Sequence, residues 1–256
     1  MRGKIVFITG ASSGIGAETA KLLAAKGAVP VITGRDERKL QEVSGAISGR
    51  HGCYRLDVTD GDDVERVVRQ AVIDYGRIDV LLNNAGFGLF ETFADAPIEH
   101  FAEMMDTNYM GIVRMAKAVL PLMRNQGGGH IVNIVSLAGK ISTPKASGYA
   151  ASKHAALGLT NAMRAELAPY GIAVSAVNPG PIDTPFFDKA DPGGSYKTNV
   201  GRFMLPQRRV AEAIVRVIER RTPEVDLPSA AAAGIKLYGL FPRLGDKLAG
   251  RFLNRK

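Results

Sequence analysis

The sequence predicts a doubly wound α/β fold around one parallel sheet of about seven strands. Two observations support this prediction. Short apolar, strand-like segments alternate along the chain with segments of helical pattern, and these strand-like segments are apolar on both faces. Strands of that kind are buried on both sides, as happens when helices cover both faces of a parallel sheet. Right-handed crossovers then give the doubly wound arrangement, and 256 residues suit a single domain of this type.

The elements are expected in a regular order. Strands are predicted at Ile5–Thr9, Val29–Thr33, Cys53–Asp57, Val80–Asn83, His130–Val135, Ala173–Asn178 and near Val225–Leu227. Helices are predicted between them at Gly14–Lys26, Asp36–Ala46, Asp60–Tyr75, Ile98–Met123, Tyr149–Tyr170 and Arg209–Arg220. The stretch 181–208 begins with a long, irregular run of Gly, Pro and polar residues, so we expect it to form a lid over the site.

The turn between the first strand and the first helix is rich in glycine and reads Thr9-Gly-Ala-Ser-Ser-Gly-Ile-Gly16. Glycines let the backbone turn tightly and approach a pyrophosphate, and the helix N-terminus presents unpaired N–H groups and a positive dipole end. A glycine-rich turn is often only a turn, so other motifs must identify a ligand. The turn predicts a nucleotide site formed by Gly10, Ser12, Ser13, Gly14, Ile15 and Gly16.

Further motifs follow at set distances. Ser136 ends a strand 13 residues before Tyr149, which opens the run Tyr149-Ala-Ala-Ser-Lys153. Asn108 lies within the long helix predicted before them, and Pro179-Gly-Pro-Ile-Asp-Thr184 follows the sixth strand. Together with the G-x-x-x-G-x-G spacing of the turn and Asn83-Asn-Ala-Gly86 after the fourth strand, this series resembles the classical short-chain dehydrogenase/reductase family.

The resemblance implies a Rossmann fold and a set of site residues. Asn108, Ser136, Tyr149 and Lys153 would form a catalytic tetrad, in which Asn108 holds a water that connects Lys153 to solvent. The cofactor would be held by the glycine-rich turn and by Arg35, Asp57, Val58, Asn84, Ala85, Gly86, Tyr149, Lys153, Pro179, Gly180, Ile182 and Thr184. Asp57 would accept a hydrogen bond from the adenine amino group, or act as the N-terminal carboxylate of the next helix, or do both.

Acid–base chemistry explains why Tyr149 and Lys153 stand together. A free tyrosine has a pKa of ~10, so it is a poor base at neutral pH. Lys153, one helical turn away, places a cation beside the phenol, and an oxidised nicotinamide adds another, so both favour the phenolate. In reduction, Tyr149 would protonate a carbonyl oxygen that receives hydride from the nicotinamide, and Ser136 would stabilise the charge developing on that oxygen.

The end of the second strand bears on the choice of cofactor, because it lies beside the adenosine ribose in this fold. An acidic residue there would favour NAD, and an arginine would pair with the 2′-phosphate of NADP. Aligned with the family, Gly34 stands where NAD users usually carry Asp, and Arg35 follows it. NADP(H) is therefore favoured over NAD(H). Asp36 could cap the next helix or reach the ribose and soften this preference.

Composition argues against several other classes of protein. The net charge is +8, and residues 202–256 carry 12 Lys/Arg against 5 Asp/Glu, without a groove-reading motif. Nucleic acid is therefore not expected as a partner. The single Cys53 and the four histidines have no disulfide or metal-ligand spacing, so no metal is expected.

No apolar run could span a membrane, and the chain starts directly in its first strand, which predicts a cytoplasmic protein without a signal peptide.

Residues 228–256 depart from the family pattern and are interpreted as an extension of a catalytic domain at 1–227. Beyond Pro242, apolar and basic side chains each recur every four residues on adjacent faces. The segment could pack on the body or line the substrate cleft, lie on an anionic membrane surface as a peripheral contact, or form a dimer contact. The resemblance implies a homodimer or homotetramer through the helices Ile98–Met123 and Tyr149–Tyr170.

These features together predict an NADP(H)-dependent oxidoreductase that interconverts a carbonyl and a secondary alcohol. Apolar residues gather in the expected lid, namely Pro185, Phe186, Phe187, Phe203, Met204 and Leu205. They favour a lipophilic substrate such as a 3-oxoacyl thioester, a steroid-like ketone or another bulky carbonyl. The alternatives are an NAD(H)-dependent alcohol dehydrogenase and a non-catalytic nucleotide sensor. Ser136, Tyr149 and Lys153, all present, argue against the sensor.

Overall fold

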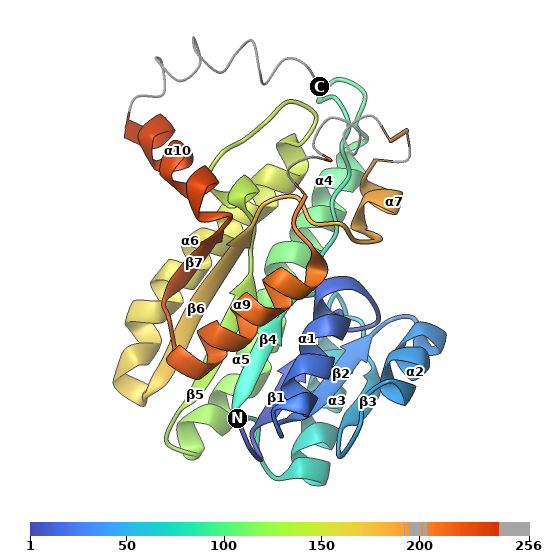
Figure 1. Ribbon diagram of the computed structural model, residues 1–256, viewed down its shortest axis with the longest axis vertical. Coiled ribbons are helices and arrows are strands. Elements are labelled where there is room, and N and C mark those ends of the chain that lie inside the picture. The colour runs from blue at the N-terminus through green and yellow to red at the C-terminus, as the bar shows by residue number, and fades with distance from the viewer. Residues whose placement is uncertain (192, 195–200, 202–203, 241–256) are drawn as a thin grey trace.

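The computed structural model describes residues 1–191, 193–194, 201 and 204–240. Within them, the strands form one parallel sheet in the order β3-β2-β1-β4-β5-β6-β7 (Figure 1). The strands are β1 (Ile5–Ile8), β2 (Val29–Gly34), β3 (Gly52–Arg55), β4 (Val80–Asn83), β5 (Gly129–Ile134), β6 (Ile172–Pro179) and β7 (Glu224–Leu227). Each lies within two residues of its predicted bounds. The doubly wound Rossmann fold is thereby confirmed.

The order of the strands reverses at β1, which pairs with β2 on one side and with β4 on the other. The chain first winds outward to β3 and then returns to wind from β4 to β7. Ligands of open α/β sheets bind in the crevice outside the carboxyl ends of the strands at such a switch point. The fold therefore directs attention to the residues that directly follow β1 and β4.

The helices are α1 (Gly14–Ala25), α2 (Glu37–Gly45), α3 (Gly61–Tyr75), α4 (Ile98–Met105), α5 (Gly111–Asn125), α6 (Ser147–Leu167), α7 (Phe186–Ala190), α9 (Gln207–Arg220) and α10 (Ser229–Leu240). Two begin at aspartates that cap their first turn. Asp36 accepts a hydrogen bond from Lys39 N, and Asp60 accepts from Asp62 N and Asp63 N. Such caps satisfy backbone donors that a helix cannot pair internally. Asp36 thus serves as the N-cap, one of the two roles considered for it.

The sheet separates two apolar cores. Successive residues of a strand point to opposite faces, and β1 follows this rule with four buried side chains. Val6 and Ile8 belong to the core beneath α1, α2 and α9, whereas Ile5 and Phe7 belong to the core beneath α3 and α5. Because both faces of the strand are buried, its sequence is continuously apolar rather than alternating.

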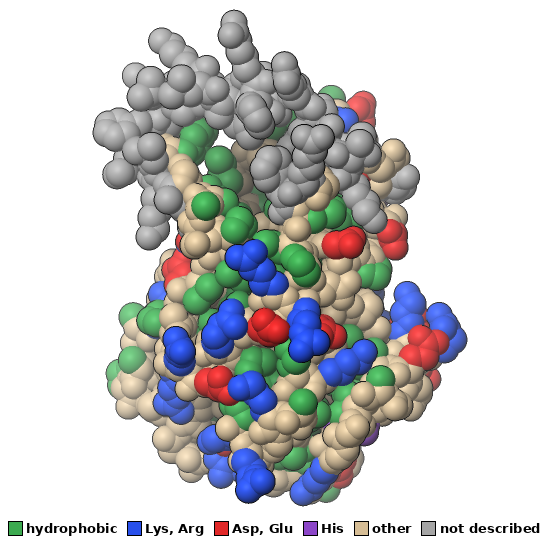
Figure 2. Space-filling view, in the orientation of Figure 1, with side chains coloured by type: hydrophobic (Ala, Val, Ile, Leu, Met, Phe, Trp, Pro, Cys, Tyr) green, Lys and Arg blue, Asp and Glu red, His purple; other side chains and the backbone are tan. Residues whose placement is uncertain are grey.

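The face formed by α1 and α9 carries charges of both signs. Figure 2 shows Lys and Arg side chains interspersed with Asp and Glu over this face. Lys26 at the end of α1 pairs with Glu219 of α9 at 2.8 Å, and Arg208 pairs with Glu212 along α9 at 3.2 Å. Exposed pairs of this kind contribute about 0–1 kcal/mol each. The packing of α9 against the sheet therefore depends mainly on its buried apolar side chains.

Three parts of the chain differ from the predicted elements. The single helix expected at Ile98–Met123 is divided into α4 and α5 by a π-helical turn at Asp106–Met110. The expected lid contains the short helix α7. After β7 the chain forms α10, which begins at Ser229 and continues through four alanines, the residue with the highest helix propensity. The predictions for residues beyond Pro242 and for Phe203 lie outside the described residues.

Candidate active site

The glycine-rich turn after β1 leaves the N-terminus of α1 open. Gly10 and Gly14 have φ values of +64° and +58°, which side chains rarely adopt. Ser13 is the N-cap of α1, but its side chain makes no capping hydrogen bond. The first N–H groups of α1 and the positive end of its dipole are therefore available to an anion. This geometry fits the pyrophosphate of a dinucleotide.

The segment after β4 packs directly against this turn. The Asn84 Nδ2 atom donates to the carbonyl oxygens of Thr9 at 3.0 Å and Gly10 at 2.8 Å, and the Thr9 Oγ1 atom accepts from Asn84 N and Ala85 N. A Cβ atom on Gly16 would lie 2.6 Å from both Asn84 Nδ2 and the Gly10 carbonyl oxygen. Gly16 is therefore required for close packing, and the two motifs form one rigid unit.

A polar groove of about 390 Å³ extends from this turn toward the end of β2. Arg35 lies at its edge with 62% of its side chain exposed, and one guanidinium nitrogen is 3.8 Å from Asp57 Oδ2. Asp57 Oδ1 accepts from the backbone N–H and the hydroxyl of Thr59. Asp36 caps α2, whereas the 3.8 Å pair with Asp57 places the guanidinium of Arg35 at the groove.

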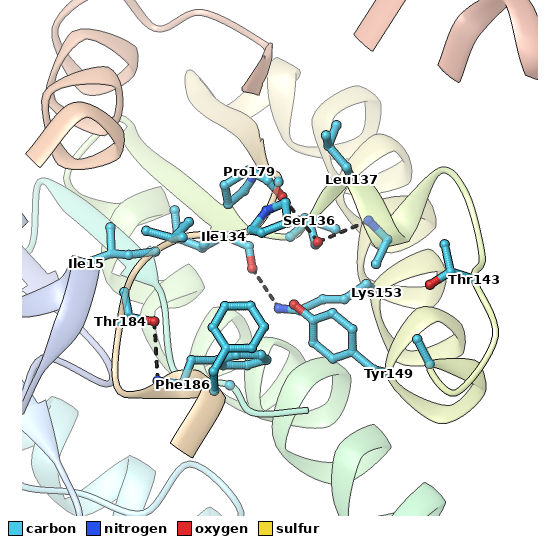
Figure 3. A pocket seen from close by; sticks show the side chains of 18 of the residues that line it. Ile15, Ile134, Ser136, Leu137, Thr143, Tyr149, Lys153, Pro179, Thr184 and Phe186 are labelled. Atoms are coloured by element: carbon cyan, nitrogen blue, oxygen red, sulfur yellow. Dashed lines mark hydrogen bonds between the residues drawn. The ribbon is translucent and has the colours of Figure 1, made fainter. Parts of the chain in front are cut away.

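Ser136, Tyr149 and Lys153 meet in a second cavity of about 270 Å³ (Figure 3). Ser136 follows β5, and its hydroxyl donates to the Pro179 carbonyl oxygen at 3.2 Å and accepts from Ala138 N at 3.0 Å. Tyr149 and Lys153 lie one turn apart on α6, with the Lys153 Nζ atom 5.7 Å from the centre of the phenol ring. The structure thus brings together three residues that the sequence separates by 17 positions.

Lys153 is buried, and only 5% of the residue is exposed to solvent. Burial disfavours the charged form and lowers the pKa of Lys153 to about 8. Its Nζ atom donates to the Ile134 carbonyl oxygen at 3.0 Å, which holds the group at the end of β5. A lysine in this state can exchange a proton near neutral pH, as acid–base chemistry requires.

Asn108 lies in the π-helical turn and is fully buried behind the cavity. Its Oδ1 atom accepts from Phe87 N at 2.9 Å, and its Nδ2 atom donates to the Phe87 carbonyl oxygen and to Ser152 Oγ. The side chain therefore fixes the loop after Gly86 to α6. Single π-helical turns are frequent at functional sites, where they redirect one side chain. The water-holding role of Asn108 stays a prediction.

All other predicted site residues line one of the two cavities, except Gly16, which packs beneath the glycine-rich turn. The cavities share Ile15, Asn84, Gly86, Thr184 and Phe186 in their walls, so they form one continuous cleft. Phe186 stands where they join. Its ring centre is 5.6 Å from that of Tyr149 and 6.3 Å from that of Phe90. The residues expected to hold a dinucleotide thus form one track that ends at Tyr149.

Several residues that line the second cavity were not predicted from the sequence. They are Phe90, Leu137, Ala138, Ile141, Thr143, Ala146 and Ile235. Phe90 follows the Asn83–Gly86 motif closely, and that position is the only signal that could have singled it out. Ile235 comes from α10, and nothing in its sequence surroundings marks it. The helix that was expected beyond Pro242 lies outside the described residues, so the interpretations of that helix stay predictions.

The described residues contain no group of three or more His, Cys, Asp or Glu side chains arranged to hold a metal. His130 lies buried on β5, where its Nε2 atom is 2.8 Å from Ser175 Oγ, and burial lowers the pKa of its imidazole to about 4. His130 therefore stays neutral at physiological pH. Among the helices of the described part of the chain, none has the length and apolar character needed to cross a bilayer.

Comparison with known proteins agrees with this geometry. The sequence pattern of the short chain dehydrogenase family matches residues 4–193. An uncharacterized oxidoreductase of Staphylococcus saprophyticus is 36% identical over 224 residues, which cover 86% of this chain and 93% of that protein. A short-chain dehydrogenase/reductase from Burkholderia phymatum, solved with NAD, has a TM-score of 0.86 at 26% identity and covers 95% of both chains.

A second similar structure was solved with NADPH instead of NAD. A variant of actinorhodin polyketide ketoreductase, solved with NADPH, has a TM-score of 0.80 at 30% identity and covers 89% of this chain and 97% of that chain. The family match covers more than half of the chain and includes the glycine-rich turn, Ser136, Tyr149 and Lys153. The protein is therefore a nucleotide-binding oxidoreductase of the classical short-chain dehydrogenase/reductase family.

Proposed function

We propose that this chain is an NADP(H)-dependent oxidoreductase that interconverts a lipophilic ketone and a secondary alcohol. The observation that carries the proposal is the continuity of the cleft. An anion-binding helix N-terminus lies at one end, and Ser136, Tyr149 and the buried Lys153 lie at the other. A bound nicotinamide supplies the hydride. The protein's own residues bind the substrate oxygen and move its proton.

Two side chains act on the substrate oxygen, and a third acts on Tyr149. Tyr149 donates a proton to it in reduction and accepts the proton in oxidation. The Ser136 hydroxyl donates to the Pro179 carbonyl oxygen at the cavity wall, and on substrate binding it turns this single proton to the substrate oxygen, where it stabilises the developing charge. Lys153 favours the phenolate of Tyr149 through its charge and replaces the lost proton, for which a pKa of about 8 is suitable.

Two features support NADP(H) over NAD(H). Gly34 has no side chain that could bind both ribose hydroxyls, and a Cβ atom there would lie 3.2 Å from Ser12 Oγ. Arg35 faces the same part of the groove and carries the charge that a 2′-phosphate would attract. Asp36 is engaged as the cap of α2, which weakens the argument that it binds the ribose.

The lining of the catalytic cavity supports a lipophilic substrate. Beyond the three catalytic side chains, most of the residues that line it are aliphatic or aromatic. Phe187 and Leu205 of the expected lid are buried, and Leu205 is tied to the strand end by backbone hydrogen bonds to Pro181 and Asp183. Burying apolar substrate surface contributes about 25 cal/mol per Å². A bulky ketone or a 3-oxoacyl thioester meets this requirement.

Other parts of the proposal rest on the family resemblance. Ile182 and Thr184 would fix the nicotinamide carboxamide, Asp57 and Val58 would contact adenine, and Asn108 would hold a water near Lys153. The catalytic domain would span 1–227, with 181–208 as a lid. A homodimer or homotetramer, a cytoplasmic location and a peripheral membrane contact through 228–256 stay predictions.

The experiment that tests the proposal is NADPH and NADH oxidation at neutral pH with a panel of 3-oxoacyl thioesters, steroid ketones, aldehydes, retinal and quinones. We expect turnover with at least one lipophilic carbonyl and a higher kcat/KM with NADPH. Tight dinucleotide binding without turnover of any carbonyl, or of the matching alcohols, would contradict an enzymatic role. A higher kcat/KM with NADH would contradict the cofactor assignment alone.

A further inference from the structure

A charged cluster lies behind the turn that carries Ser136. Lys140 comes directly after the 3₁₀ turn Leu137–Gly139, whose N-cap is Ser136. Its Nζ atom contacts both carboxylate oxygens of Asp226, at 2.6 and 2.7 Å, and one carboxylate oxygen of Glu224. Both acidic residues belong to β7. The cluster therefore joins the serine turn to a strand that is far from it in sequence.

Asn178 on β6 completes this cluster from the side of the sheet. Its Nδ2 atom donates to Glu224 Oε1 at 2.9 Å and to Asp226 Oδ1 at 2.7 Å. Asn178 is fully buried and lies opposite Asp226 in the register of β6 and β7. The next residue, Pro179, supplies the carbonyl oxygen that accepts from the Ser136 hydroxyl. The acceptor of the Ser136 hydroxyl is thus one peptide unit from the cluster.

The charges of the cluster are largely withdrawn from water. The side chain of Lys140 is 18% exposed and that of Asp226 is 11% exposed. Burial alone would lower the pKa of Lys140, but hydrogen bonds and attraction from Asp226 and Glu224 outweigh it and raise this pKa. Lys140 therefore stays charged. Without Lys140, Asp226 and Glu224 would keep their hydrogen bonds from Asn178 but lose the cation that balances them, which costs more than losing a surface pair.

Two further contacts connect this cluster to the catalytic cavity. The Gly180 N–H donates to the Leu227 carbonyl oxygen at 2.7 Å, so the end of β6 is held against the end of β7. A Cβ atom on Gly139 would lie 2.8 Å from the Lys153 carbonyl oxygen, so the serine turn packs tightly on α6. The positions of Ser136, the Pro179 carbonyl oxygen and α6 are thus fixed by one set of contacts.

We propose that Lys140 and Asp226 are positioning residues, which act through the serine turn to hold the Ser136 hydroxyl where it meets the substrate oxygen. This inference rests on the proposed role of Ser136. A displacement of about 1 Å at a reacting group can cost on the order of 100-fold in rate. A partial loosening of the turn should therefore lower kcat roughly tenfold, while the part of the dinucleotide groove at the glycine-rich turn and the end of β2, formed by other elements, should keep most of the affinity.

The test is a double-mutant cycle of Lys140→Met and Ser136→Ala, with kcat, KM for the carbonyl, dinucleotide affinity and melting temperature measured for each protein. Lys140→Met should lower kcat about tenfold and change the dinucleotide Kd by less than about twofold. In the Ser136→Ala background, the same substitution should cost less than about twofold, because no hydroxyl remains to be positioned.

Lys4→Met is the matched control, because Lys4 pairs with the buried Asp79 at 3.1 Å near the amino ends of the strands. It removes a lysine from an ion pair remote from the catalytic cavity, where Arg77 still pairs with Asp79 at 2.7 Å, and it should leave kcat unchanged. Asp226→Asn keeps the shape of the cluster and removes one charge, so it tests the positioning role even if Lys140→Met folds poorly. It should also lower kcat. Equal losses for Lys140→Met with and without Ser136, or no loss at all, would overturn the positioning role. Full activity of Ser136→Ala would instead overturn the proposed role of Ser136 itself.

Discussion

The two ends of the cleft are formed in different ways. The cofactor groove is shaped by backbone, because Gly10 and Gly16 leave no space for a side chain and Asn84 binds carbonyl oxygens of the turn. The catalytic cavity is shaped by side chains, with Phe90, Phe186 and Ile235 contributed by three separate segments. Backbone shape requires particular residue types in a short stretch, whereas an apolar wall accepts many residues.

This difference has a consequence for function. A groove made of backbone suits a chemical group that is the same in every dinucleotide cofactor, such as a pyrophosphate at a helix N-terminus. A wall made of apolar side chains can vary while the catalytic residues remain, so the substrate is set by parts of the chain that carry no chemistry. Variants of each region separate these two contributions, and the largest effect is expected at Tyr149 in the catalytic cavity.

Tyr149→Phe should have the largest effect, because it removes the proton donor and keeps the ring that packs against Phe186. We expect turnover to fall at least ~100-fold, the lower end of general-acid contributions. Dinucleotide affinity should stay within about twofold, since the substitution leaves the glycine-rich turn and the N-terminus of α1 unchanged. Steady-state kinetics and NADPH fluorescence titration measure the two quantities. Near-normal turnover would remove Tyr149 from its assigned role.

Lys153→Met tests the buried charge that the catalytic region carries. The pKa of Lys153 is about 8 in the folded protein and near 10.5 when unfolded, so between these values the unfolded state binds more protons. The difference in unfolding free energy between the wild type and Lys153→Met should therefore increase by about 1.4 kcal/mol per pH unit from pH 8 to 10.5. Below pH 8 this difference should stay constant. Urea unfolding without dinucleotide at several pH values gives this difference. A constant difference across the range would mean that the pKa is not lowered.

Gly16→Ala tests the backbone-shaped region. The added methyl group would lie 2.6 Å from the Gly10 carbonyl oxygen and from Asn84 Nδ2, so the turn must shift. We expect the unfolding free energy to fall by about 1–3 kcal/mol, with weaker binding of both NADPH and NADH. Gly45→Ala, at the end of α2 with no atom within 4 Å of the new Cβ, is the control and should not destabilise the protein. Equal behaviour of the two variants would show that the tight packing around Gly16 has no energetic role.

The same contrast decides how much of the molecule could be predicted. The strands and the glycine-rich turn were predictable, because burial on two faces and positive φ values restrict the sequence locally. Ser136, Tyr149 and Lys153 were singled out by their spacing and the family resemblance, and the structure places them in one cavity, while their catalytic roles stay predictions. The π-helical turn at Asn108 was missed, because it continues the helical pattern on both sides. The contribution of Ile235 arises from tertiary packing of α10, for which no local pattern exists.

Arg35→Gln should have a smaller and selective effect, confined to the phosphate that distinguishes the two cofactors. A hydrogen bond to a charged group contributes about 1.5–3 kcal/mol, so kcat/KM with NADPH should fall about tenfold relative to that with NADH. Arg38→Gln is the control, since Arg38 is exposed and pairs with Glu42 on α2. If the NADPH-to-NADH ratio stays the same in Arg35→Gln, another group must read the 2′-phosphate.

Ile235→Ala should have the smallest effect, because it removes three carbon atoms from a half-buried position in the wall and leaves the chemistry intact. Each buried methylene is worth about 0.8 kcal/mol, or roughly fourfold in kcat/KM. The variant should therefore shift kcat/KM toward bulkier carbonyls by a few-fold, with no change for a small ketone or for dinucleotide binding. Ile73→Ala on α3, where the side chain is 70% exposed and remote from the cleft, is the matched control. If both variants keep the same order of substrates, α10 does not select the substrate, and the side chains that do so lie nearer to Phe90 and Phe187.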